Sequence, residues 1–168
     1  MKRYANLIFI LIIMGCTNTT PDYQEKKKSD TVDYIYVNST RPVKELIPLV
    51  LNGDTDAYYE LYIAYYELNP SDFLPYALLM ANKYDYDKAY YDVFDRLTLL
   101  YWKSYNKSIS LDSLDNQTRK MALDYLKKGA EKGEYNSLRD LGWLYLEGKH
   151  VKKDTILGNQ LLEKARNK

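Results

Sequence analysis

The 168-residue chain has one cysteine, Cys16, and one histidine, His150. A single cysteine cannot form a disulfide within the chain, and one cysteine with one histidine cannot make the usual zinc sites. His150 lies among lysines in an expected turn, and we interpret it as a solvated loop residue. The seven glycines fall mostly at expected helix ends, so no glycine-rich loop is present to hold a phosphate. We therefore expect no metal and no cofactor.

An excess of charge of one sign is also lacking, since 24 Lys and Arg stand against 23 Asp and Glu. Nucleic-acid binding depends on clustered cations, so we expect no nucleic-acid partner. Two carboxylate pairs, Asp92 with Asp95 and Asp112 with Asp115, have a spacing that acid–base chemistry or Ca²⁺ binding can use. Neither pair has the carboxylate density of a calcium loop, and solvated side chains are the simpler interpretation. We predict no catalytic residue.

A long hydrophobic run is missing as well. The apolar stretch from Ala5 to Met14 is far shorter than the roughly 20 residues of a membrane-spanning helix. Positive residues precede it and Gly15-Cys16 ends it, which resembles a bacterial lipoprotein signal. The resemblance implies removal of residues 1–15 and lipidation of Cys16, with a tether over 16–38. The alternative is a buried thiol near an uncleaved helix.

The lipoprotein resemblance also implies where the protein resides. Acyl chains on Cys16 would hold it at a membrane of the bacterial cell envelope. Thr17, in place of aspartate after the cysteine, favours the outer membrane, and nothing indicates which leaflet. Within the tether, Lys26, Lys27 and Lys28 can touch anionic headgroups, but a solvated run is the simpler interpretation. The Val32–Val37 stretch is expected to lie extended along the first helices.

The most regular pattern runs from Met121 to Ala165. Apolar and small residues recur at spacings of three and four on either side of Gly133, which predicts two helices joined by a turn. Asp154 is expected to cap a third helix. The stretch resembles the Sel1-like repeat, a relative of the tetratricopeptide repeat. The matching positions are Ser137, Leu141-Gly142, Tyr145, Gly148, Val151, Asp154, Gly158 and Lys164-Ala165.

The same offsets recur upstream of that stretch. Gly53 and Asp85 are each followed, at the distances seen after Gly133, by a small and then a branched apolar residue. A helix is expected from near Pro42 to Leu51. We therefore predict an all-α domain over 39–168, a short α/α solenoid of about three Sel1-like helix pairs. The repeats fall at about 53–84, 85–132 and 133–168.

Two departures from the repeat pattern shape this expectation. The second repeat is longer, which places an insertion at 104–117 and a new helix near Thr118. Tyr62 and Phe94 occupy the position that glycine holds in the third repeat, and their bulk is expected to push neighbouring helices apart.

Tyrosine is the abundant aromatic, with 19 residues against three Phe and two Trp. In tetratricopeptide-like solenoids the first helix of each pair lines the concave surface. The resemblance places there Asp56, Tyr59, Ile63, Tyr66, Lys88, Tyr91, Asp95, Arg139 and Trp143. Mixed aromatic and charged side chains suit a protein or peptide partner. The alternative is that the tyrosines only cover the edge of the core.

Two functions remain open at this point. The first is a non-enzymatic interaction module, anchored in the envelope, whose partner is unknown. An immunity or inhibitor role and an assembly role both fit that description. The second is a glycan-binding protein or envelope hydrolase that uses the tyrosine-rich face with Asp92 and Asp95.

Overall fold

The computed structural model describes residues 41–68, 70–99 and 111–168. Within these ranges the chain is helical and contains no β-strand, so the all-α prediction is confirmed for them. The elements are α1 (Val43–Leu51), α2 (Thr55–Leu68), the 3-10 turn η2 (Pro70–Phe73), α3 (Leu74–Tyr84), α4 (Asp87–Leu99), the 3-10 turn η3 (Leu111–Ser113), α5 (Asn116–Glu131), α6 (Tyr135–Glu147) and α7 (Thr155–Arg166). The expected signal, Cys16, the tether with Val32–Val37, and residues 104–110 of the insertion lie outside the described residues. Residues 111–117 of the insertion form η3 and the start of α5.

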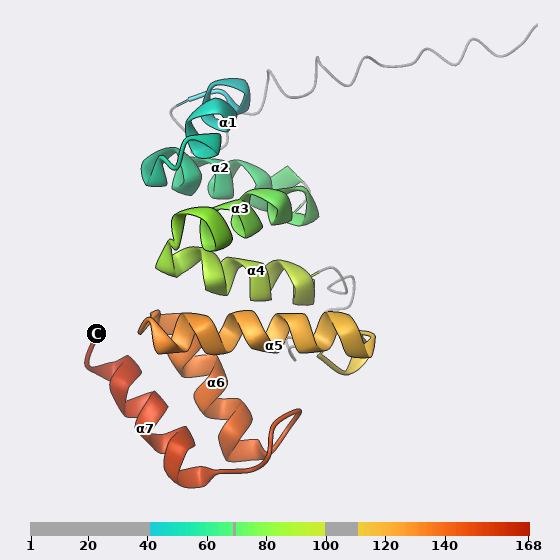
Figure 1. Ribbon diagram of the computed structural model, residues 1–168, viewed down its shortest axis with the longest axis vertical. Helices are drawn as coiled ribbons and strands as arrows, with labels where there is room; N and C mark the ends of the chain where they lie inside the picture. The colour runs from blue at the N-terminus through green and yellow to red at the C-terminus, as the bar shows by residue number, and fades with distance from the viewer. Residues whose placement is uncertain (1–40, 69, 100–110) are drawn as a thin grey trace, which may run out of the picture.

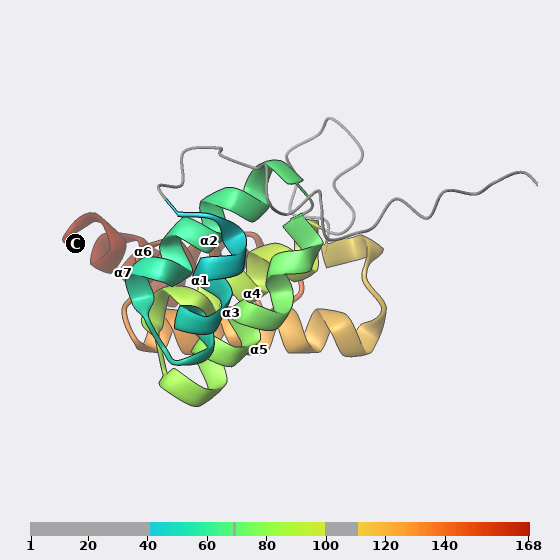
Figure 2. The same cartoon turned by 90° about the horizontal axis from the view of Figure 1, so that it is seen from above.

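The helices stack in chain order, from α1 at one end to α6 and α7 at the other (Figure 1). Seen along the stack, they lie across one another rather than end to end (Figure 2). Each helix packs against its neighbour in sequence, except that α2 reaches α3 mainly through η2. Two pairs of helices that are not consecutive also contact each other: α1 with α3, and α4 with α6. The stack therefore has an even-helix face, formed by α2, α4 and α6, and an odd-helix face.

The predicted helix ends at Gly53, Gly133 and Gly148 are confirmed, and each glycine has a positive φ. Asp85 occupies the equivalent turn with φ 53°, a left-handed conformation that aspartate tolerates better than most residues. The Asp154 side chain accepts the Leu157 N–H and caps α7, as expected.

The core has small residues where helices approach closely. Ala57, Ala89 and Ser137, which follow the three turns at the same offset, are fully buried. A Cβ on Gly129 would lie 2.2 Å from the Ser137 Oγ, so α5 and α6 meet almost at van der Waals contact. The Gly158 backbone approaches the Gly142 carbonyl in the same way at the crossing of α6 and α7.

The packing between α2 and α3 is different. Tyr62 packs its ring edge against Phe73 of η2, with centroids 5.5 Å apart. Phe73 is fully buried and also contacts the ring of Tyr58. The aromatic bulk at 62 is thus accommodated by η2, which fills the space between α2 and α3.

Candidate functional site

The candidate binding residues on α2 differ in exposure. Tyr59 is 58% exposed, Asp56 is exposed and Ile63 is half-buried. Tyr66 belongs to the same helix, but its side chain lies outside the described part of the chain. Among the α2 residues whose side chains are described, Tyr59 is therefore the exposed aromatic one.

The candidates on α4 and α6 lie on the same face of the stack. On α4, Lys88 is exposed, whereas Tyr91 and Asp95 are half-buried. On α6, Arg139 is partly exposed and Trp143 is 52% exposed. The candidate residues with described side chains thus all lie on the even-numbered helices, and Tyr59 and Trp143 are the exposed aromatic residues among them.

An acidic side chain follows each of the three turns at the same offset: Glu60 on α2, Asp92 on α4 and Asp140 on α6. We call these three residues the acidic row. Only Asp92 was singled out from the sequence. The common offset was the signal that would have identified the other two.

Each member of the acidic row accepts a hydrogen bond from a preceding element. The Arg41 guanidinium, just before α1, donates to Glu60 with Nη2 to Oε1 at 2.8 Å. The Tyr58 hydroxyl of α2 donates to the Asp92 carboxylate at 2.7 Å. The row therefore links successive parts of the stack by side-chain hydrogen bonds.

The third link joins α4 to α6. The Tyr91 hydroxyl donates to Asp140 Oδ2 at 3.0 Å, and the Arg139 Nε donates to Asp140 Oδ1 at 2.7 Å. Tyr91 is therefore engaged within the protein, in contrast to Tyr59. The buried surroundings raise the pKa of the Tyr91 hydroxyl, and the Asp140 and Asp95 charges raise it further.

Burial also perturbs the two carboxylates of the enzyme hypothesis. It raises the pKa of Asp92 to about 7, and the nearby Asp95 charge adds to the rise, while the Tyr58 hydrogen bond opposes it. Burial and the Asp140 charge raise the pKa of Asp95 as well, against the effect of Arg96. A carboxyl with a pKa near 7 can exchange a proton at neutral pH, which is what general acid–base chemistry requires.

Arg96 explains part of this electrostatic pattern. Its side chain is fully buried, and its guanidinium lies over the rings of Tyr62 at 4.7 Å and Phe73 at 5.6 Å. The Nη2 is 3.7 Å from the Asp95 carboxylate. The positive charge is thus held behind the even-helix face by aromatic rings, while the carboxylates lie closer to solvent.

The exposed side chains of α6 form a stripe that we call the α6 stripe: Tyr135, Arg139 and Trp143, spaced four residues apart. Tyr135 is 50% exposed, and the Arg139 guanidinium lies 5.8 Å from its ring centre. Tyr135 was missed from the sequence, although its spacing from Arg139 and Trp143 indicates a shared helix face.

Other tyrosines serve as links within the stack. The Tyr84 hydroxyl donates to the Leu51 carbonyl of α1, and Tyr90 donates to Asp85 in the turn before α4. Tyr125 of α5 exchanges hydrogen bonds with Asn82 of α3 at 2.7 and 2.9 Å. These three tyrosines, together with Tyr58 and Tyr91, therefore make structural hydrogen bonds within the stack.

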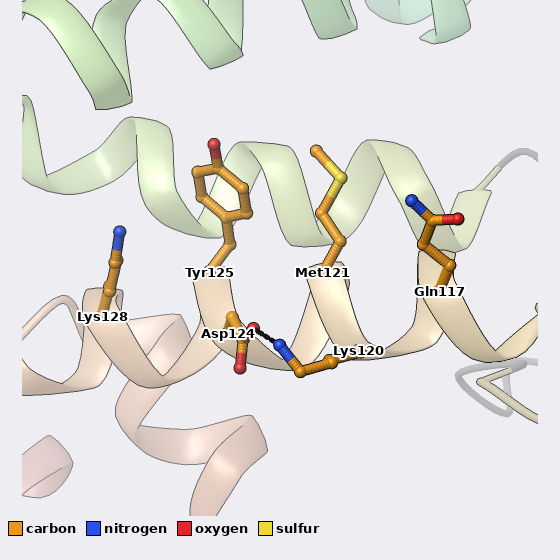
Figure 3. Close-up of a pocket in the computed structure, with 6 residues that line it drawn as sticks. All are labelled: Gln117, Lys120, Met121, Asp124, Tyr125 and Lys128. Carbon is orange, nitrogen blue, oxygen red and sulfur yellow. Dashed lines mark hydrogen bonds and ion pairs between the residues drawn. The ribbon is translucent and has the colours of Figure 1, made fainter.

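A shallow depression of about 310 Å³ lies along α5 on the odd-helix face. Its lining residues all come from α5: Gln117, Lys120, Met121, Asp124, Tyr125 and Lys128. Figure 3 shows Gln117, Met121, Tyr125 and Lys128 pointing to one side, with the Lys120–Asp124 ion pair in front. None of the sequence candidates lies here, and the mixed lining indicates no particular chemistry.

The interpretation of His150 as a solvated loop residue is wrong. Its side chain is only 12% exposed, and its Nε2 lies 3.0 Å from Asp112 Oδ1. Lys149 pairs with the same carboxylate at 3.2 Å. Asp115 instead caps α5, accepting the Gln117 and Thr118 N–H groups. The Asp112/Asp115 pair therefore does not act as a unit.

Within the described ranges, no group of three or more His, Cys, Asp or Glu side chains could hold a metal ion. Nor does any helix of that part have the length and apolar character needed to cross a membrane. Comparisons with protein-family models, with curated proteins and with solved structures found no match to the chain.

Proposed function

We propose that this chain is a binding protein of the bacterial cell envelope whose even-helix face holds another protein. In this proposal the stacked hairpins form a Sel1-like solenoid, a lipid on Cys16 anchors it, and its role is non-enzymatic. The observation that carries the proposal is the exposure of Tyr59 on α2 and of Tyr135 and Trp143 on α6, with Asp56, Lys88 and Arg139 on the same set of even-numbered helices. Exposed aromatic rings bordered by charges are typical of protein-binding surfaces.

Crosslinking in cells tests the role of the face. A photo-crosslinking amino acid at Trp143 or Tyr59 is expected to yield a discrete adduct whose partner mass spectrometry identifies. The same amino acid at Lys120 on α5, or at Ile156 on α7, serves as the matched exposed control. Adducts of equal yield at all four positions, or at the controls alone, would contradict the proposal. The partner's identity would distinguish an immunity or inhibitor role from an assembly role.

The anchor is tested separately from the face. Cells fed a fatty-acid analogue are expected to label the protein, and the Cys16→Ser variant is expected to lose that label. Persistent labelling of Cys16→Ser would exclude the anchor while leaving the binding face untouched. Fractionation then shows whether the labelled protein lies in the outer membrane.

One observation favours the second candidate, a glycan-binding protein or hydrolase. The raised pKa of Asp92, to about 7, places a proton-exchanging carboxyl beside Tyr58 and Asp95. Against it, the Asp92 carboxylate is bound by the Tyr58 hydroxyl and so has a structural use. Incubation of the purified protein with cell-wall glycan fragments distinguishes this candidate from the protein-binding role. Turnover or binding that Asp95→Asn abolishes would support the hydrolase or glycan-binding protein.

A further inference from the structure

Arg139 on α6 is held by its neighbour in the chain through a single nitrogen. Its Nε donates to Asp140 Oδ1 at 2.7 Å, and the Asp140 side chain is only 9% exposed. The second oxygen, Oδ2, accepts the Tyr91 hydroxyl of α4. Because both of its oxygens are engaged, Asp140 fixes the direction of the guanidinium without binding its Nη1 and Nη2 groups.

The arginine that pairs with another member of the acidic row is bound differently. Arg41 donates to Glu60 from both Nε and Nη2, so its fork closes on one carboxylate. Arg139 makes no such fork, and its Nη groups donate to no residue in the described part of the chain. The Arg139 side chain is 40% exposed. Its two Nη groups are therefore open to an acceptor from outside the protein.

Aromatic rings flank this guanidinium along α6. Tyr135 and Trp143, four residues before and after it, are 50% and 52% exposed. The guanidinium lies 5.8 Å from the Tyr135 ring centre. Trp, Tyr and Arg are the residue types most enriched among those that dominate protein–protein binding energies. The α6 stripe thus offers hydrogen-bond donors between two apolar surfaces.

The charges around Arg139 do not favour an ion as its ligand. The guanidinium and the Asp140 carboxylate together have no net charge. The Asp140 charge also raises the pKa of Asp95 on α4, so the two carboxylates repel each other. An incoming carboxylate would meet the same repulsion, and an incoming cation would meet the guanidinium.

The acceptor that fits these donors is therefore neutral. Resting on the proposed binding role, we infer that Arg139 donates from Nη1 and Nη2 to an uncharged carbonyl oxygen, which the partner protein presents between apolar side chains. A main-chain carbonyl or a side-chain amide supplies such an oxygen. The flanking rings of the α6 stripe cover the apolar side chains on either side.

Tyr91 is a positioning residue in this arrangement. Without its hydroxyl, Oδ2 of Asp140 becomes available to Arg139. The guanidinium can then close a fork on one carboxylate, as that of Arg41 does. Its Nη2 group is then no longer open to the partner. Loss of the Tyr91 hydroxyl is therefore expected to weaken binding only while Arg139 is present.

The probe is the partner protein that photo-crosslinking at Trp143 captures, purified and immobilised. Biolayer interferometry measures its dissociation constant from the full-length protein in detergent. Arg139→Gln is expected to weaken binding about fivefold or more, as for an arginine at the centre of an interface. Arg166→Gln on α7, the matched exposed arginine, should change binding by less than about twofold. Equal effects of the two substitutions would overturn the inference.

Salt dependence distinguishes a carbonyl acceptor from a charged one. The parent and Arg139→Gln are expected to lose affinity by the same factor between about 0.05 and 0.5 M NaCl, because a hydrogen bond to an uncharged oxygen is screened little. A steeper loss in the parent would indicate a carboxylate acceptor and would overturn the inference.

A double-mutant cycle tests the positioning role. Tyr91→Phe is expected to weaken binding about two- to fivefold in the parent and to have no effect in Arg139→Gln. A purely structural role of Tyr91 would weaken binding equally in both backgrounds, and that result would exclude positioning. Circular dichroism checks that each variant is folded.

Failure of this inference is distinguishable from failure of the proposed function. A partner that is crosslinked at Trp143 but binds Arg139→Gln as tightly as the parent overturns the role of Arg139 alone. The proposed function would then stand. The absence of face-specific adducts in cells would remove the proposed function and, with it, this inference.

Discussion

Replacing Asp92 by asparagine is expected to stabilise the protein at pH 8. The Asp92 pKa is about 7 in the folded protein, against an ordinary value of 3.8. Between these values the folded state holds a proton that the unfolded state has lost, so stability falls as pH rises. Each pKa unit corresponds to 1.36 kcal/mol, and the full shift amounts to about 4 kcal/mol above pH 7. Below pH 4 the cost disappears.

Asparagine removes this cost with little change of shape. Its amide oxygen can still accept the Tyr58 hydroxyl, although a hydrogen bond to a neutral acceptor is weaker by about 1 kcal/mol. We therefore expect a gain of about 2–4 kcal/mol in the free energy of unfolding at pH 8. At pH 5 the gain should be smaller by about 2–3 kcal/mol, because Asp92 is then protonated in the folded state.

Urea denaturation of both proteins at pH 5 and pH 8 measures these free energies. Carboxylates far from Asp92 titrate equally in the parent and the variant, so the difference between the two curves reports Asp92 together with its coupling to Asp95. Asp124→Asn is the control, since that half-exposed side chain pairs with a solvated lysine and should change stability by less than about 1 kcal/mol. An Asp92→Asn variant that is no more stable than the parent at pH 8 would refute the reasoning.

Two further substitutions test the packing of the stack. Tyr91→Phe removes the hydroxyl that donates to Asp140 and should lower the free energy of unfolding, measured by urea denaturation, by about 1–2 kcal/mol. Tyr59→Phe changes an exposed ring and should be nearly neutral. Equal effects of the two substitutions would contradict a stabilising Tyr91–Asp140 hydrogen bond. Gly129→Ala places a Cβ against Ser137 and should cost about 1–3 kcal/mol, although alanine is the better helix former. Lys128→Ala, one residue earlier and exposed, is its control, and a stabilised Gly129→Ala would show that α5 and α6 can separate freely.

Local features, such as helix ends, were the easiest to predict from the sequence. Glycine at 53 and 133 predicts a helix end because a left-handed turn excludes most side chains, and this holds whatever the partner helix is. The start of α5 was placed near Thr118, but the helix begins at Asn116 because the Asp115 side chain caps it. A cap shifts a boundary without changing the periodic pattern from which the helix was predicted.

Contacts between residues that are distant in the chain could not be predicted from the sequence in the same way. His150 lies in a lysine-rich turn, and its contact with Asp112, much earlier in the chain, leaves no trace in the local sequence pattern. Tyr91 was a candidate for binding because its position repeats that of Tyr59. Its hydrogen bond to Asp140 depends on the spacing of α4 and α6, which no single repeat specifies.

The tyrosine pairs show how one pattern serves two purposes. Neighbouring residues on a helix point about 100° apart, so Tyr58 can be buried against Phe73 while Tyr59 is exposed. Where Gly129, Ser137 and Gly158 let α5, α6 and α7 approach closely, α2 has bulky Tyr62 at the position that corresponds to Gly142. Small residues hold α5, α6 and α7 close, and hydrogen bonds from tyrosine hydroxyls link the helices before them. Tyrosine hydroxyls on α2 and α4 thus link helices by hydrogen bonds, while the ring of Tyr59 is left exposed.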